Sequence, residues 1–92
     1  MNLRQLEYFK GVADQKGFRK AAERLYVTQP SISKAVSSLE KEFSVGLINR
    51  SAKTFELTPA GMILYKSADR ILSFYYNEID ELHNLFGAEK GA

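Results

Sequence analysis

Residues 31–38 contain four serines, at positions 31, 33, 37 and 38, together with Lys34. Serine is a mediocre helix former, so a helix face selected for stability alone would favour Glu, Lys, Gln and Arg. Short hydroxyls instead let a helix lie close to a neighbouring surface while they donate and accept hydrogen bonds. A DNA major groove presents base edges and phosphates to such a face. The alternative interpretation is an ordinary solvent-exposed face that happens to be rich in serine.

The residues around these serines strengthen the DNA-binding interpretation. Lys34 and Lys41 supply cations on the same face as Ser33 and Ser37. Gln29 has the amide group that pairs with adenine, and the free amides at the start of a helix can bind a phosphate.

A second basic feature follows along the chain. Residues 47–50 and 55–57 are short strand candidates separated by a polar turn, which predicts a β-hairpin with Arg50 and Lys53 at its tip. A basic hairpin beside a DNA-reading helix can place cations along the phosphates or in the minor groove. Two cations near a turn are by themselves commonly just solvated, so this interpretation depends on the helix that precedes the hairpin.

Three short helices are predicted to position these groups. Apolar residues recur at helical spacing over 3–13, Gly17 interrupts the pattern, and a short apolar stripe follows over 18–25. Pro30 then suits the first turn of a third helix, and Thr28 can cap the exposed amides of that helix. Two helices joined by about three residues form a helix-turn-helix, which we place at about residues 18–37.

A much longer helix is expected from Pro59 to about Phe86, because Thr58 and Pro59 form a helix start and only Gly61 interrupts the pattern. A compact core of residues 1–58 cannot cover so long an apolar face, so we expect a second copy of the chain to pack on it, parallel or antiparallel. The alternative partners for this apolar face are a membrane surface and a downstream domain. The residues assigned to the dimer interface are Leu64, Ala68, Ile71, Leu72, Tyr75, Ile79 and Leu82.

Composition argues against catalysis and against a membrane-spanning segment. The 92 residues include one histidine and no cysteine, which excludes thiolate metal sites and leaves no His-based catalytic constellation. No apolar run approaches the roughly 20 residues needed to span a bilayer. We therefore expect a cytoplasmic protein that is not an enzyme and holds no metal or cofactor.

The charge is divided unevenly along the chain. The net charge is only +2, yet residues 16–53 contain eight Lys and Arg against three Glu, whereas residues 67–92 contain two basic against five acidic residues. Such an asymmetry favours a basic module followed by a segment with another role.

The order and spacing of these motifs resemble the LysR-type transcriptional regulators. The matching segments are FRKAAERL at 18–25, VTQPSISK at 27–34, VGL at 45–47 and LTPAG at 57–61, together with Arg50 and Lys53. The resemblance implies a mainly α fold: a winged helix-turn-helix of three helices plus a small β-hairpin wing over 1–58, the wing at about 47–57, then a long dimerisation helix over 59–86.

The resemblance also implies a function, sequence-specific binding of double-stranded DNA by a bacterial regulator that acts as a homodimer on an interrupted inverted repeat. The implied DNA-binding residues are Thr28, Gln29, Pro30, Ser31, Ser33, Lys34 and Ser37 from the recognition helix, with Arg50 and Lys53 from the wing. Residues 87–92 would begin a hinge. The C-terminal effector domain would be absent, so an inducer and an RNA polymerase contact would belong to the parent protein, in the nucleoid of a bacterium.

Two other functions remain open from the residues. A helical protein-interaction module would use the long apolar helix to bind a foreign partner. An RNA-binding protein is less well supported, because no aromatic side chains lie among the basic residues where bases would stack.

Overall fold

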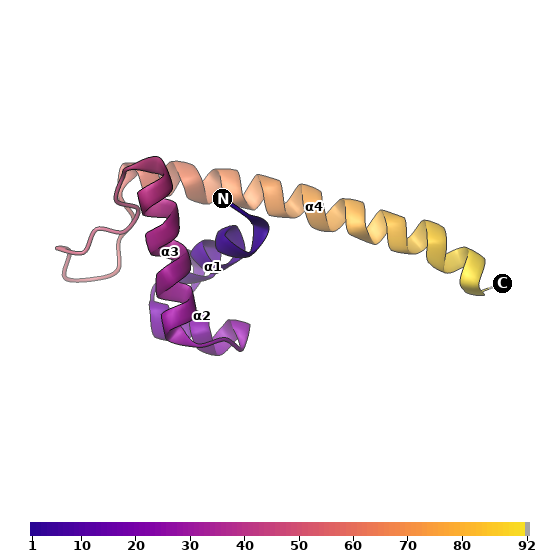
Figure 1. Ribbon diagram of the computed structural model, residues 1–92, viewed down its shortest axis with the longest axis horizontal. Coiled ribbons are helices and arrows are strands. Elements are labelled where there is room, and N and C mark those ends of the chain that lie inside the picture. The colour runs from indigo at the N-terminus through magenta and orange to yellow at the C-terminus, as the bar shows by residue number, and fades with distance from the viewer. Residues whose placement is uncertain (92) are drawn as a thin grey trace.

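The computed structural model describes the backbone of residues 1–91 and the side chains of residues 1–87. Four helices form in the order α1 (Leu3–Gln15), α2 (Phe18–Leu25), α3 (Gln29–Phe43) and α4 (Pro59–Gly91). The first three pack into one unit, from which α4 extends far to one side (Figure 1). The predicted mainly helical class is confirmed.

Local sequence signals define the helix ends of the three-helix unit. Asn2 and Gln5 form a capping box at the start of α1, in which each side chain accepts a hydrogen bond from the other residue's backbone amide. Thr28 caps α3, as predicted, with Pro30 in the first helical turn. Lys16, Tyr26 and Ser44 end α1, α2 and α3 in the left-handed conformation.

The core of the three-helix unit lies where α1, α2 and α3 meet. Phe9 and Val12 from α1 pack against Ala21 of α2 and against Ile32 and Val36 of α3, all with no solvent exposure. Each large side chain in this position contributes about 1.5–3 kcal/mol relative to an exposed one. The small side chain of Ala21 allows the helices to approach closely. Helical spacing predicts a buried stripe on α3 of Ile32, Ala35, Val36, Leu39 and Phe43; the first four are buried, whereas Phe43 at the end of the helix is 44% exposed. The buried residues fix which face of α3 points outward.

The segment between α3 and α4 is a hairpin with almost no strand structure. Ile48 and Leu57 form a single antiparallel bridge, and the Asn49 amide donates to the Glu56 carbonyl oxygen at 2.9 Å. The prediction of two strands was wrong in extent. The carboxamide oxygen of Asn49 accepts hydrogen bonds from the amide and hydroxyl of Ser51, which turns the chain instead of continuing the strand pair.

Helix α4 is anchored at its start by Thr58. The Thr58 hydroxyl donates to the Gly46 carbonyl oxygen at 2.6 Å and accepts from the Gly61 amide at 3.0 Å, while the Thr58 amide donates to the Leu47 carbonyl oxygen. The helix then continues to Gly91, past Phe86, where we expected a hinge to begin. Ala92 lies outside the described residues.

The predicted dimer interface is divided by the structure. Ala68 is fully buried and Leu72 nearly so, and both pack with Leu64 against Leu3 and Leu6 of α1. Their apolar surface is thus covered within the chain, and the assignment of Ala68 and Leu72 to a dimer interface was wrong. Helical spacing alone does not distinguish the two neighbouring faces of one helix.

Gly61 provides a direct test of the junction between the wing and α4. A Cβ atom built on Gly61 would overlap the backbone carbonyl oxygen of Leu47. We expect Gly61→Ala to lower the free energy of unfolding by about 3 kcal/mol, because a backbone group has to move. Gly87→Ala is the matched control: nothing lies near its Cβ position, so the gain in helix propensity makes this variant slightly more stable. Urea denaturation followed by circular dichroism measures both, and equal stability of the two variants would contradict this packing.

Candidate nucleic-acid interface

The outward face of α3 carries the polar residues predicted to bind DNA. Burial of the opposite face holds this surface in place. The predicted residues that are exposed are Thr28, Gln29, Pro30, Ser31, Lys34 and Ser37, whereas Ser33 is half-buried. The structure therefore brings the predicted recognition residues together on one helix, within reach of a single ligand surface.

The start of α3 is held by hydrogen bonds between Thr28 and Ser31. The Thr28 hydroxyl accepts a hydrogen bond from the Ser31 amide at 3.3 Å and lies 2.7 Å from the Ser31 hydroxyl. These two hydroxyls satisfy part of each other's hydrogen-bonding capacity. Gln29 and Lys34 are not held in this way, and they are the stronger candidates for base and phosphate contacts.

A groove beside α3 contains Arg4, a cationic residue that is not among the predicted site residues, together with Lys34. It has a volume of about 390 Å³ and is lined by Asn2, Arg4, Gln5, Tyr8, Ser31, Lys34, Ala35 and Ser38. Arg4 of α1 thus shares a concave surface with Lys34 and Ser31. The sequence contained a signal for this, since Arg4 faces away from the apolar side of α1, but only the tertiary fold places it beside α3.

Tyr26 is another exposed residue that is not among the predicted site residues. It occupies the turn between α2 and α3 with φ 57° and is 94% exposed. An aromatic ring held away from the protein surface next to the recognition helix is a candidate contact for a sugar or a phosphate.

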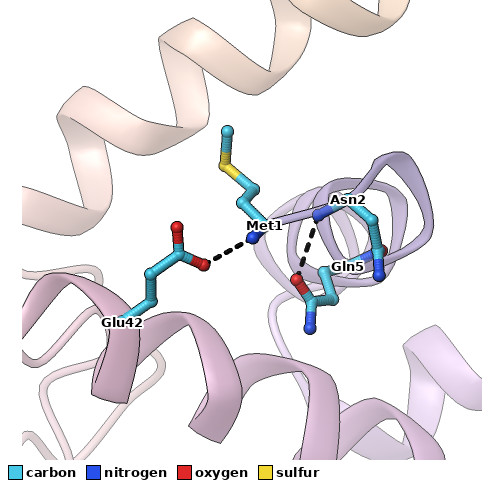
Figure 2. A network of polar contacts seen from close by, with 4 residues as sticks. All are labelled: Met1, Asn2, Gln5 and Glu42. Carbon is cyan, nitrogen blue, oxygen red and sulfur yellow. Dashed lines mark hydrogen bonds and ion pairs between the residues drawn. The ribbon is translucent and has the colours of Figure 1, made fainter.

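The N-terminus of the chain meets the far end of α3. The Met1 ammonium lies 2.6 Å from the Glu42 carboxylate, next to the capping box of Asn2 and Gln5 (Figure 2). This ion pair ties the start of α1, and with it Arg4, to the recognition helix.

The two predicted wing residues have different environments. Lys53 is exposed in the loop of the hairpin. Arg50 is held close to the protein: its guanidinium lies 3.3 Å from the Glu40 carboxylate and 5.6 Å from the centre of the Phe18 ring. Neither Lys34 nor Lys53 forms an ion pair within the part of the chain that the structure describes. Their charges are therefore available to a ligand.

Glu40 connects the wing to the recognition helix. Its Oε2 accepts a hydrogen bond from the Leu47 amide at 2.8 Å, and its Oε1 faces Arg50. The Glu40 side chain is only 19% exposed, so water competes weakly for these contacts. One carboxylate thus sets the position of the hairpin relative to α3.

The residues that the structure describes contain neither a candidate metal site nor a candidate membrane-spanning helix. No His, Cys, Asp or Glu side chains cluster there in a way that could hold a metal ion. Nor is any helix in that part of the chain long and apolar enough to cross a membrane.

A helix-turn-helix with an exposed basic face, followed by a basic hairpin, defines a winged helix-turn-helix DNA-binding domain. Residues 3–62 match the family model described as a bacterial regulatory helix-turn-helix protein of the lysR family. Since this match covers more than half of the chain, the protein belongs to the LysR family and is the DNA-binding domain of a transcriptional regulator.

Similar proteins agree with this assignment. The chain is 44% identical over 78 residues to the HTH-type transcriptional regulator CysL of Bacillus subtilis (strain 168), covering 85% of this chain and 26% of CysL. It is 40% identical over 90 residues to a probable RuBisCO transcriptional regulator of Phaeodactylum tricornutum, covering 98% of this chain and 29% of the relative. The chain therefore spans less than a third of the length of these relatives.

Solved structures show the same fold. The BenM_DBD/catB site 1 DNA complex superposes with a TM-score of 0.87 at 32% identity, covering 92% of this chain and 96% of the other. The CbnR_DBD–DNA complex gives a TM-score of 0.82 at 38% identity, covering 92% and 98%. Both of these neighbours are DNA-binding domains crystallised with DNA.

The role of Glu40 can be tested by its removal. Glu40→Ala leaves the Leu47 amide without its acceptor and Arg50 without its partner, so we expect the free energy of unfolding to fall by about 1–3 kcal/mol. Glu23→Ala is the matched control, because Glu23 forms only an exposed ion pair with Arg19 within α2. Urea denaturation measures the free energy of unfolding of both variants. If Glu40→Ala lowers it by no more than Glu23→Ala does, the Glu40 carboxylate does not hold the wing.

Proposed function

We propose that the chain binds specific double-stranded DNA as a homodimer on an interrupted inverted repeat. The recognition helix α3 would enter the major groove, and the wing would contact the backbone or the minor groove. The observation that carries this proposal is the exposed face of α3, on which Gln29 and Lys34 lie above a fully buried apolar face. The DNA complexes of BenM_DBD and CbnR_DBD support it.

Individual contacts follow from the environment of each side chain. Gln29 is suited to adenine, and Lys34 to a base edge or a phosphate. Thr28, Pro30, Ser31, Ser33 and Ser37 would fit the helix closely against the groove. Lys53 is the wing cation that is free to reach the backbone. Arg50 would contact DNA only while it remains oriented by Glu40.

An exposed apolar face of α4 supports dimerisation. Exposed apolar residues that are not covered by α1 lie along one side of this helix. The members of this face are Ile63, Ile71, Phe74, Tyr75, Leu82 and Leu85. Three of the predicted interface residues, Ile71, Tyr75 and Leu82, belong to this face. Ile79 is half-buried and Leu64 contacts α1 at the side of the face.

Charge favours an antiparallel pairing of two α4 helices. A pairing centred on Phe74 places Ile63 opposite Leu85 of the partner subunit, and Arg70 opposite Glu78 of the partner subunit, because each pair is equidistant from Phe74. A parallel pairing would set Arg70 against the partner subunit's Arg70 and Glu78 against its Glu78, which is repulsive. The antiparallel form is therefore the one we propose.

An apolar groove at the start of α4 fits the same arrangement. It has a volume of about 240 Å³ and is lined by Phe43, Val45, Leu47, Ala60, Ile63, Leu64 and Ser67. Antiparallel pairing brings Leu85 of the partner subunit to Ile63, at the mouth of this groove. The partner would then contact the end of α3 as well as α4.

DNA binding is tested by removing the two side chains that lie free on α3. We expect Lys34→Ala to weaken binding to a duplex selected from a random pool about tenfold, and Gln29→Ala to relax the base preference at one position. Lys66→Ala, which removes an exposed cation on α4, is the matched control and leaves affinity nearly unchanged. Gel shifts at fixed salt measure the affinities. Unchanged affinity of both α3 variants, or equal binding of duplex RNA, would argue against this function.

The pairing direction is tested by exchanging charges on α4. Arg70→Glu places two acidic residues opposite each other in an antiparallel dimer, so we expect the dissociation constant of the dimer to rise about tenfold. The double variant Arg70→Glu, Glu78→Arg restores the complementary pairs and the dimer. Sedimentation equilibrium measures both. A parallel dimer predicts no such restoration, and a persistent monomer would instead favour a module that binds a foreign protein.

A further inference from the structure

Helix α4 contacts α1 through an apolar strip that is bordered by polar residues along one edge. The strip consists of Leu6 from α1 with Ala68 and Leu72 from α4, and Leu3 and Leu64 lie at its ends. Along this border the Tyr65 hydroxyl hydrogen-bonds to Asp14, Lys10 forms an ion pair with Asp69, and Tyr76 of α4 lies beside Glu7 of α1. We call these three pairs the polar ladder.

The first two pairs form one connected network. The Tyr65 hydroxyl donates a hydrogen bond to the Asp14 carboxylate. The Lys10 ammonium lies 2.8 Å from Asp14 and 3.9 Å from Asp69, and 5.6 Å above the centre of the Tyr65 ring. Burial disfavours the charged Asp14, but the hydrogen bonds from Lys10 and Tyr65 outweigh it and lower the pKa of the Asp14 carboxyl. The network is therefore stable in its ionised form at neutral pH.

The third pair extends the ladder along both helices. Hydrogen bonding to Glu7, together with burial, raises the pKa of Tyr76 to about 12, so its hydroxyl stays protonated as a donor. Glu7, Lys10 and Asp14 are spaced so that they share one face of α1, and Tyr65, Asp69 and Tyr76 likewise share one face of α4. On α4 this face lies on the other side of the apolar strip from the proposed dimer face.

The ladder supplies what the apolar strip lacks, a preferred direction. Apolar contact is non-directional, so two helices can rotate or slide across it at little cost. Hydrogen bonds weaken steeply when they are misaligned. Because the start of α4 is already fixed by Thr58, a second, directional attachment at Tyr65–Tyr76 determines the angle at which α4 leaves the three-helix unit.

This angle matters because α4 acts as a long lever. The 15 residues that follow Tyr76, up to Gly91, extend about 22 Å beyond the ladder at 1.5 Å per residue. A rotation of about 10° about the ladder would move the far end by about 4 Å, which is roughly one base-pair step in a duplex that turns once in about 34–36 Å. In a dimer joined through α4, the same rotation would move the two recognition helices relative to each other.

We propose that the polar ladder is the positioning element that sets the distance between the two DNA half-sites. Its residues are positioning residues, since they act through α4 and touch no DNA. The proposal rests on the dimer proposed above, and it assigns the specificity for half-site spacing to residues outside the recognition helix and the wing.

The test uses two variants that each remove one hydrogen-bonding group from the ladder, Tyr65→Phe and Asp14→Asn. Duplexes carrying half-sites selected from a random pool are prepared with the spacing between half-sites varied one base pair at a time. For the unsubstituted chain we expect one preferred spacing. In both variants the preference for that spacing over its neighbours falls about fivefold, while the affinity for a single half-site stays unchanged. Asp80→Asn, which removes an exposed carboxylate elsewhere on α4, is the matched control and keeps the preference.

A second measurement reports the geometry without DNA. Because the chain has no cysteine, Lys20→Cys introduces a single attachment point for a spin label on exposed α2. We expect the distance distribution between the two labels of a dimer to broaden or shift in Tyr65→Phe and Asp14→Asn, but not in Asp80→Asn.

The possible outcomes distinguish failure of the proposed role of the ladder from failure of the dimeric DNA-binding function on which that role rests. Variants that dimerise and bind DNA with the original spacing preference and the original label distances would overturn the role of the ladder alone. A uniform loss of affinity at every spacing would assign the ladder to stability and likewise overturn it. An unsubstituted chain that stays monomeric in sedimentation, or that binds no duplex, would overturn the proposed dimeric function and the ladder's role with it.

Discussion

The DNA-reading surface depends on the burial of one face of α3. Ile32, Val36 and Leu39 have no solvent exposure, and they can be buried only if the residues between them point outward. The polar residues of α3 are thus oriented by the apolar ones. The same burial places Glu40 at the edge of the core, where its carboxylate contacts both the Leu47 amide and the Arg50 guanidinium. The helix and the wing are consequently joined into one surface, although the wing has almost no strand pairing.

Much of this arrangement could be predicted from local signals in the sequence. Thr28 and Pro30 define the start of α3, Thr58 and Pro59 define the start of α4, and the apolar stripe of α3 gives its buried face. Each of these depends on residues a few positions apart, so the sequence contains all the information. The match to the lysR family model over residues 3–62 agrees with the helix-turn-helix predicted from these signals.

What the sequence did not predict depends on contacts between distant segments. Arg4 lies beside Lys34 only because α1 crosses α3, and Arg50 meets Glu40 and Phe18 only once the hairpin folds back. The apolar stripe on α4 was predicted to form one dimer interface because its helical periodicity continues along the whole stripe. Only the position of α1 shows that Ala68 and Leu72 belong to the interior of one chain. The strands of the wing were overestimated since Asn49 forms a turn that competes with strand pairing.

The contacts between α1 and α4 also bear on how such regulators can be recombined. Thr58 is the obvious place to divide a winged helix-turn-helix from the helix that follows it, because a helix begins there. The burial of Ala68 and Leu72 and the attachment of Tyr65 and Tyr76 mean that the first half of α4 folds as part of the preceding unit. A chimera that exchanges DNA-binding units between relatives would therefore keep its native interior only if the crossover lies beyond Tyr76, inside a continuous helix.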